Sequence, residues 1–251
     1  MGKRMRANGN EERLVVGTRG VAKLLLVLLA IELALVAAYL LTRTWVNSAE
    51  LTRLFDLDGE GNIPAWFSSV QLFAIAVAFG LAAINPLHER GGWSGFLVVC
   101  GGGFGLLSVD EAAGIHEQVN RVLKRVDWWP RFPSGRGFWI FAYGTAGLGM
   151  LALMWRRVAR FFRQHRRDAM AMTAGMGVLV GGAFGVEAIG YEWVGLDGPE
   201  RWQIAQVAAE EFMEMLGASL VFVAVLRFAA RAAVNERERA PRVRVAAVGA
   251  E

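Results

Sequence analysis

The chain has 251 residues, 55% of them hydrophobic, and a formal net charge of +4 at pH 7. Apolar runs of about 20 residues recur along it, which is the length that a helix needs to cross a bilayer. Its single cysteine, Cys100, excludes an internal disulfide and a zinc site built from several thiolates. The sequence therefore predicts an all-α, polytopic membrane protein.

Six apolar segments have the length and composition of transmembrane helices. In chain order, the expected bundle has about six spans, at roughly residues 21–41, 64–84, 93–113, 137–155, 170–190 and 203–229. We expect one transmembrane domain, residues 21–229, preceded by a basic arm, residues 1–20. Residues 230–251 form a second basic extension, which we expect to be partly disordered.

The positions of Lys and Arg predict how the bundle is oriented. Basic residues gather in the N-terminal arm, after the sixth span, and in "RRVARFFRQHRR" between spans four and five. Because cytoplasmic loops carry an excess of Lys and Arg, we place these segments and both termini in the cytoplasm, which predicts a plasma (inner) membrane protein. Membrane topology already explains the basic segments, so nucleic-acid binding is not needed to account for them, and we expect no nucleic-acid partner.

A short stretch between spans three and four has amphipathic character. Residues 117–129, "EQVNRVLKRVDWW", carry apolar residues at near-helical spacing with Arg and Lys on the opposite side. This pattern predicts a short helix that lies at the outer membrane interface. The following "PRFPSGRG", residues 130–137, ends it before the fourth span.

Four ionisable residues lie at the outer end of the third span, within "LLSVDEAAGIHEQV". They are Asp110, Glu111, His116 and Glu117. On a continuous helix His116 lies about a third of a turn from the face of Asp110, unless the helix loosens at Gly114. The alternative interpretation is that the helix has already left the membrane, so that these are surface residues and Glu117 pairs with Arg121.

The sixth span carries a polar stripe that runs from the outer surface toward the middle of the membrane. Its members recur three or four residues apart, as residues on one helix face do: Gln203, Gln206, Glu210, Glu214 and Gly217, with Glu211 just beside them. Ionisable residues at this depth in a span indicate a function by default.

The first, second and fifth spans add further polar residues. Glu32 lies near the middle of the first span, either as part of a polar pathway or as a protonated packing residue. Ser68, Ser69 and Gln71 of the second span either join the same polar region or hydrogen-bond between helices, and the second role is the commoner one. In the fifth span, Glu187 lies near the depth of Asp110. Tight helix packing is predicted there through a double GxxxG ridge: Gly177, Gly181 and Gly185.

Carboxylates that converge in a medium of low dielectric repel one another and lose solvation. They are stable there if they are protonated, if they line a water-filled cavity, or if they bind a cation. With one outer histidine and no thiolate pair, the residues favour a divalent metal, with Fe, Mn or Zn as the candidates. The predicted metal ligands are Asp110, Glu111, His116, Glu117, Glu187, Glu210, Glu211 and Glu214.

Two functions fit these residues. The first is a membrane-embedded, metal-dependent enzyme with its site near the outer face, whose partners are the lipid bilayer and a lipid or other amphiphilic substrate. The second is a cation- or proton-coupled transporter or channel that uses the same acids, continued by Glu32. A transporter needs polar access from both faces, and the inner half of the spans is nearly all apolar. This favours the enzyme.

Overall fold

The computed structural model describes the backbone of residues 2–46, 48–84, 92–130, 132, 137–190 and 199–248. Within these ranges, side chains are described from residue 19 to residue 231, except for that of Glu187. The described residues form helices and loops and contain no strand. The helices are α1 Gly2–Thr44, α2 Ala49–Leu54, α3 Ile63–Ala83, α5 Ser94–Ala113, α6 Ile115–Leu123, α7 Phe138–Gln164, α8 Arg166–Val180, the π-helix η1 Gly181–Val186, α9 Glu187–Ile189 and α10 Glu200–Val248.

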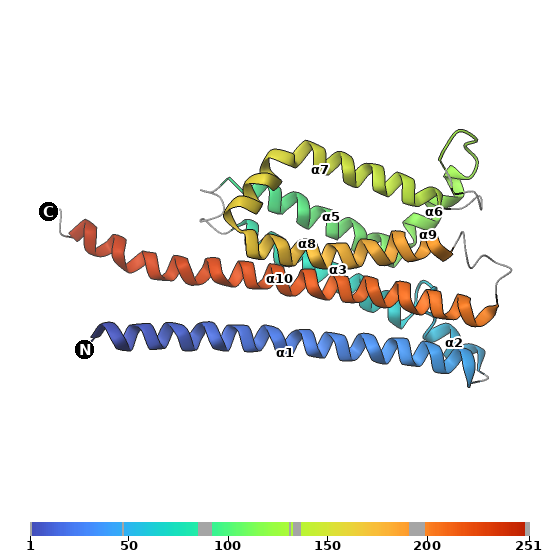
Figure 1. Ribbon diagram of the computed structural model, residues 1–251, viewed down its shortest axis with the longest axis horizontal. Helices are drawn as coiled ribbons and strands as arrows, with labels where there is room; N and C mark the ends of the chain where they lie inside the picture. Colours follow the sequence, from blue (N-terminus) through green and yellow to red (C-terminus); the bar gives the residue numbers. More distant parts are fainter. Residues whose placement is uncertain are drawn as a thin grey trace.

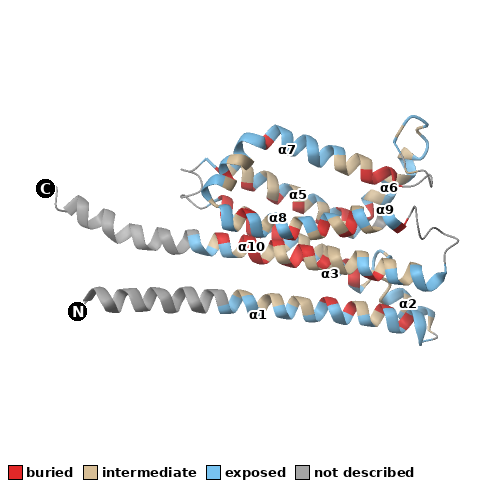
Figure 2. Ribbon diagram, in the orientation of Figure 1, coloured by how far each residue is buried: buried red, intermediate tan, exposed pale blue. Residues whose placement is uncertain are grey.

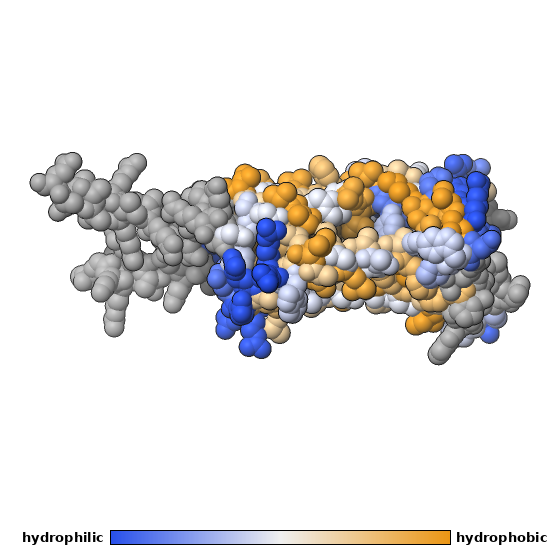
Figure 3. All heavy atoms as spheres, turned by 90° about the horizontal axis from the view of Figure 1, so that it is seen from above, coloured by the Kyte–Doolittle hydropathy of each residue, from blue (hydrophilic) through white to orange (hydrophobic). Residues whose placement is uncertain are grey.

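Six helical segments are long and apolar enough to cross a membrane. They are Arg19–Thr44, Ile63–Ala83, Ser94–Ala113, Phe138–Gln164, Arg166–Val186 and Glu200–Arg231. Figure 3 shows a largely hydrophobic band on one face of the bundle, with hydrophilic groups gathered at its two ends. The prediction of an all-α, multi-pass membrane protein is therefore confirmed.

The spans run side by side in alternating directions around α10. Both chain termini lie at one end of the bundle (Figure 1), which we call the terminal end; the opposite end, where α3 and α10 begin, is the acidic end. Half of the most apolar window of α10 is buried, against 17% for α1 and for α7. Figure 2 shows the same contrast between a buried centre and exposed outer helices. α1, α3 and α8 pack on α10, whereas α5 packs mainly on α3.

The two extensions that the sequence predicted are helical in their backbone. α1 begins at Gly2 and α10 continues to Val248, beyond the apolar spans at the terminal end. The side chains of residues 2–18 and 232–248 lie outside the described part of the structure. The division into a basic arm, a transmembrane domain and a basic tail stays a prediction.

An apolar core fills the half of the bundle nearer the terminal end. It joins α3, α5, α8 and α10, and its most enclosed side chains are Ile75, Leu97, Val221 and Val225. Aromatic rings close it toward the terminal end, where Phe161 and Phe228 lie 5.4 Å apart between ring centroids. This core fills the bundle between its middle and the terminal end.

Glycines bring α8 and α10 into close contact, but not the glycines that the sequence predicted. A Cβ atom at Gly175 would lie 2.7 Å from the backbone nitrogen of Val221, and one at Gly182 would lie 2.9 Å from the carbonyl oxygen of Glu210. Cβ atoms at Gly177 and Gly185 would meet nothing within 4 Å. A Cβ atom at Gly181 would lie 3.4 Å from the Met213 side chain of α10, so the predicted ridge is wrong at Gly177 and Gly185. The face that packs against α10 carries Gly175 and Gly182, which are seven residues apart. Gly177 and Gly185 lie outside that face.

This packing predicts different effects for two neighbouring substitutions. We expect Gly175→Val to destabilise the bundle by about 1–3 kcal/mol or more, because a side chain there overlaps the α10 backbone. Gly177→Val is the matched control, since it adds the same atoms to an exposed face of the same helix. The midpoints of thermal unfolding in detergent micelles compare the two variants, and an equal loss in both would contradict the observed packing.

Candidate functional site

Ionisable residues from three separate segments gather at the acidic end. The loop between α2 and α3, the junction of α5 with α6, and the first half of α10 supply them. We call them the acidic cluster: Asp58, Glu60, Asp110, Glu111, His116, Glu117, Glu210, Glu211 and Glu214. The cluster extends across the acidic end from α5 to α10, through charge interactions that join Glu111 to Glu211.

A helix break brings His116 back to Asp110. α5 ends and α6 begins at Gly114, whose φ of 58° lies in the left-handed region that favours glycine. After the break, an Asp110 carboxylate oxygen accepts a hydrogen bond from the backbone nitrogen of His116 at 2.6 Å, and lies 3.3 Å from its Nδ1. The sequence allowed His116 to approach Asp110 only if the helix loosens at Gly114, and the structure confirms that break. Asp110 orients the imidazole ring.

Aromatic side chains form a wall beside this Asp–His pair. The Trp139 ring, at the start of α7, lies 5.4 Å from the His116 ring and 5.3 Å from Phe184 of η1, between centroids. Tyr143, one turn further along α7, is hydrogen-bonded to the Asp110 carboxylate. The pair therefore has an apolar, aromatic surface on one side and a hydroxyl group within reach.

The loop before α3 contributes two acids that the sequence reasoning missed, Asp58 and Glu60. The Glu60 carboxylate lies so close to Gly114 that a Cβ atom there would overlap it. Asn62, the N-cap of α3, holds the loop by donating hydrogen bonds to the carbonyl oxygens of Asp56 at 2.6 Å and Gly59 at 2.8 Å. The run "DLDGEGN", residues 56–62, carried the signal: three acids in one short turn immediately before a span.

The surroundings of this loop disfavour its negative charges. Desolvation, and then the neighbouring carboxylate of Glu117, raise the pKa of Glu60. Desolvation and the carboxylate of Asp56 raise the pKa of Asp58. A carboxyl group with a raised pKa holds its proton to a higher pH, so protons compete with any cation at this loop, and cation binding is expected to weaken as the pH falls.

Glu211 is the α10 residue at which the segments meet. It lies close enough for charge interaction with Glu111 of α5 and Asp58 of the loop, besides Glu210 and Glu214 of its own helix. On the same face, Gln206 Nε2 donates a hydrogen bond to Glu210 at 3.2 Å. The predicted polar stripe of α10 thus lies against η1 and α8, whereas Glu211, beside the stripe, lies within range of the charge of Glu111.

A π-helix lies against this stripe. A Cβ atom at Gly182 of η1 would come within 3.1 Å of the side chain of Glu214. One π-helical turn changes the helical phase, and such turns occur frequently at functional sites. η1 leads directly into Glu187, the predicted ligand of the fifth span, whose side chain lies outside the described residues.

Not every member of the acidic cluster is enclosed. Glu117 is exposed on α6, and its carboxylate lies 4.0 Å from the guanidinium of Arg121 one turn later. The simple surface pairing therefore describes Glu117 better than a buried ligand role. Asp110 is buried, and Glu111 and Glu211 are half-buried, so the enclosed part of the cluster consists of residues from α5 and α10.

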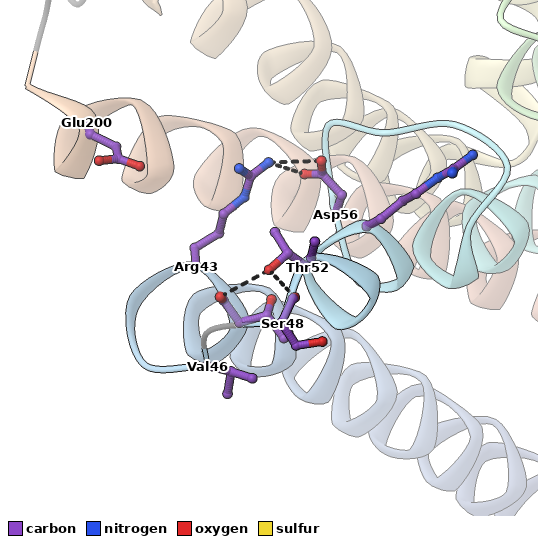
Figure 4. Close-up of a pocket in the computed structure, with 9 residues that line it drawn as sticks. Arg43, Val46, Ser48, Thr52, Asp56 and Glu200 are labelled. Carbon is purple, nitrogen blue, oxygen red and sulfur yellow. Dashed lines mark hydrogen bonds and ion pairs between the residues drawn. The ribbon is translucent and has the colours of Figure 1, made fainter.

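A polar hollow of about 450 Å³ opens beside the cluster, on the side of α1 and α2 (Figure 4). Its lining residues are Thr42, Arg43, Val46, Ser48, Ala49, Thr52, Arg53, Asp56 and Glu200. Both carboxylate oxygens of Asp56 lie 2.8 Å from the Arg43 guanidinium, so the two charges neutralise each other there. We regard the cluster, rather than this hollow, as the site of chemistry, because the Asp–His pair lies in the cluster.

The cluster is not preorganised as a metal centre with several protein ligands. Among the described residues, no three His, Cys, Asp or Glu side chains are placed to share one metal ion. Hard cations such as Mg²⁺ often bind one or two carboxylates and complete their coordination with water or substrate oxygens. The acidic cluster suits a cation that is held by one or two carboxylates and by water, or a cation around which further carboxylate side chains rotate.

Comparison with known families identifies one match. The model of a domain of unknown function, DUF8692, matches residues 24–229, which include four of the six spans entirely, most of the first and the last, and the whole acidic cluster. Neither the curated proteins nor the solved structures contain a match to this chain.

Proposed function

Because the chain belongs to the DUF8692 family, a domain of unknown function, we propose its function from the acidic cluster. The proposal is a membrane-embedded enzyme that depends on a divalent cation, Fe, Mn or Zn, and acts on a lipid or another amphiphile. The observation that carries it is the charge coupling of Glu211 to Glu111 and Asp58, which come from two other segments of the chain.

A cation explains why these acids lie together. Carboxylates that approach one another away from bulk water cannot all remain ionised unless positive charge compensates them. A divalent ion between α5 and α10 supplies that charge and joins segments that are far apart in the sequence. Glu111 of α5 and Glu211 of α10 are its proposed ligands, and water or substrate oxygens would complete the coordination.

The Asp110–His116 pair favours hydrolysis as the reaction. A histidine that is oriented by a carboxylate has the arrangement of a general base, with Asp110 fixing the ring through Nδ1. A bound divalent cation lowers the pKa of a coordinated water and polarises a substrate oxygen. Tyr143 lies where it can hydrogen-bond to a reacting group, and the rings of Trp139 and Phe184 offer an apolar surface to an acyl chain.

The position of the cluster supports an amphiphilic substrate. The cluster lies at one end of the hydrophobic band, where the headgroups of a lipid leaflet would lie. We place the acidic end at the outer face of the plasma membrane, because Lys and Arg are in excess in the segments that we expect to be cytoplasmic. A substrate would therefore enter laterally from the outer leaflet.

The apolar core argues against the transporter alternative. A pathway for ions needs polar groups along the whole length of the bundle. About halfway along the bundle Glu32, Gln71 and Ser219 are buried polar residues, but from there to the terminal end the described interior is filled by residues such as Leu97 and Val225, each 0% exposed. We therefore favour a reaction centre that opens to one face.

The purified protein in lipid nanodiscs tests the proposal. We expect hydrolysis products of a nanodisc lipid, detected by mass spectrometry, with Mn²⁺ or Zn²⁺ present and none with EDTA. His116→Ala is expected to lower turnover at least a hundredfold, within the range that a general base contributes. Cation flux through the protein in sealed vesicles, without any lipid turnover, would instead favour the transporter.

A further inference from the structure

Three helices meet at a fully buried polar triad about halfway along the bundle. Glu32 of α1 and Ser219 of α10 are 0% exposed, and Gln71 of α3 is 6% exposed. Ser219 Oγ donates to Glu32 Oε1 at 2.6 Å, and Gln71 Nε2 donates to the same oxygen at 2.9 Å. Gln71 Nε2 also donates to Ser219 Oγ at 2.8 Å. The triad thus ties α1 to the centre of the bundle.

Two atoms of the triad have no hydrogen-bond partner, Glu32 Oε2 and Gln71 Oε1. Both are acceptors, whereas the two N–H groups of Gln71 and the hydroxyl of Ser219 are already used as donors. The triad therefore contains one donor too few. One added proton on Glu32 Oε2 turns that atom into a donor that can pair with Gln71 Oε1.

Rotating the Gln71 amide by 180° does not remove this need. Its oxygen would then face Glu32 Oε1 across 2.9 Å, and two acceptors at that distance require a proton between them. The count of donors and acceptors leads to the same requirement in both orientations.

No neighbouring side chain supplies positive charge to Glu32. α3 has no ionisable residue at all, and on α1 the nearest basic residues are Lys23 and Arg43, nine and eleven positions away. On α10, Glu214 lies five positions from Ser219, about 7.5 Å along the helix, and would add negative charge. Arg227 lies eight positions away on the other side, about 12 Å along the helix.

We propose that Glu32 binds one proton on Oε2, and that this proton completes a neutral acid–amide pair with Gln71 which locks α1 to α3 and α10. The inference does not rest on the proposed function, because none of the three residues belongs to the acidic cluster. Ionisation of Glu32 would place an uncompensated charge between three packed helices, so the proton is part of the folded structure.

Infrared difference spectra between the wild type and Glu32→Gln test the proposal at neutral pH. We expect the carbonyl band of a protonated carboxylic acid in the wild type, absent from Glu32→Gln and shifted to higher frequency in Gln71→Leu, where the acid loses its acceptor. Glu50→Gln is the matched control. Glu50 is exposed on α2, and hydrogen bonds from backbone N–H and Ser48 lower its pKa, so that variant should lose a carboxylate band instead.

Thermal unfolding gives a second readout. Glu32→Gln is expected to unfold at the wild-type temperature, because glutamine replaces a neutral acid of the same shape, whereas Glu32→Ala unfolds at a lower temperature. Three results would overturn the proposal: a carboxylate band for Glu32, a Glu32→Gln variant that fails to fold, or wild-type stability that requires Na⁺ and cannot use choline. The last result would assign a sodium ion to the triad. Unchanged Mn²⁺ affinity in Glu32→Gln keeps this test separate from that of the acidic cluster.

Discussion

Replacing Glu211 by glutamine is expected to lower the affinity of the acidic cluster for Mn²⁺ about a hundredfold. Glu211 is the residue whose charge interacts with acids of both other segments, so its loss removes the centre of the proposed site. A unit charge about 5 Å from another contributes about 3 kcal/mol at an effective dielectric constant of about 20. That energy corresponds to roughly a hundredfold in affinity. The amide keeps the shape of the side chain, so we expect the fold to persist.

Isothermal titration of the purified protein with Mn²⁺ measures this effect. Glu50→Gln is the control, because it removes one exposed carboxylate from α2, at the same end of the bundle, without touching the cluster. We expect wild-type affinity for Glu50→Gln and a similar large loss for Glu111→Gln. Equal affinities in all these variants would show that the cluster is not a cation site.

Replacing Gly114 by alanine is expected to harm both the fold and the site. A left-handed residue other than glycine costs roughly 1–2 kcal/mol, and Gly114 has a φ of 58°. A Cβ atom at this position also overlaps the carboxylate of Glu60, which must swing away. We therefore expect Gly114→Ala to lose stability and, in addition, about tenfold in Mn²⁺ affinity, equivalent to about 1.4 kcal/mol.

Gly61→Ala separates the two effects. Gly61 has a φ of 69° in the loop that carries Glu60, but a Cβ atom there meets nothing within 4 Å. It should lose stability like Gly114→Ala while keeping more of its cation affinity. In a double-mutant cycle, Glu60→Gln should weaken binding in the wild type and have no further effect in Gly114→Ala. Additive losses would mean that Glu60 acts independently of Gly114.

The sequence predicted the membrane spans because hydropathy and length depend on local composition alone. The predicted second and third spans, 64–84 and 93–113, differ from the observed helices by at most one residue at each end. The fifth differs more: its α-helix ends at Val180 and a π-helix follows. A change of helical type leaves little trace in hydropathy, since it arises from packing against α10.

The choice of helix faces was harder to predict than the helices. A GxxxG pattern is present at Gly177, Gly181 and Gly185, but which face of a span meets its neighbour depends on the whole bundle. The structure uses Gly175 and Gly182 instead. For α10, by contrast, the polar stripe identified the inward face correctly, because Glu210 and Glu214 cannot face lipid without a large free-energy penalty.

The candidate site was predicted in part. The depth of the acids in the spans suggested that Glu111 and Glu211 interact, and the two lie within range of each other's charge; their role as metal ligands stays a prediction. Asp58 and Glu60 were missed because they lie in a loop, where acids are ordinary. Their role depends on the left-handed turn at Gly114, which no periodicity reveals. Glu117 was predicted as a ligand because it adjoins other acids in the sequence, but its side chain is exposed and lies near Arg121.

Anomalous scattering from crystals of the protein soaked in Mn²⁺ tests the central claim most directly, because it locates the cation itself. The claim predicts one strong peak between α5 and α10, within coordination distance of Glu111 and Glu211. A peak at exposed carboxylates such as Glu117, or ordered Glu111 and Glu211 side chains with no peak between them, would contradict it.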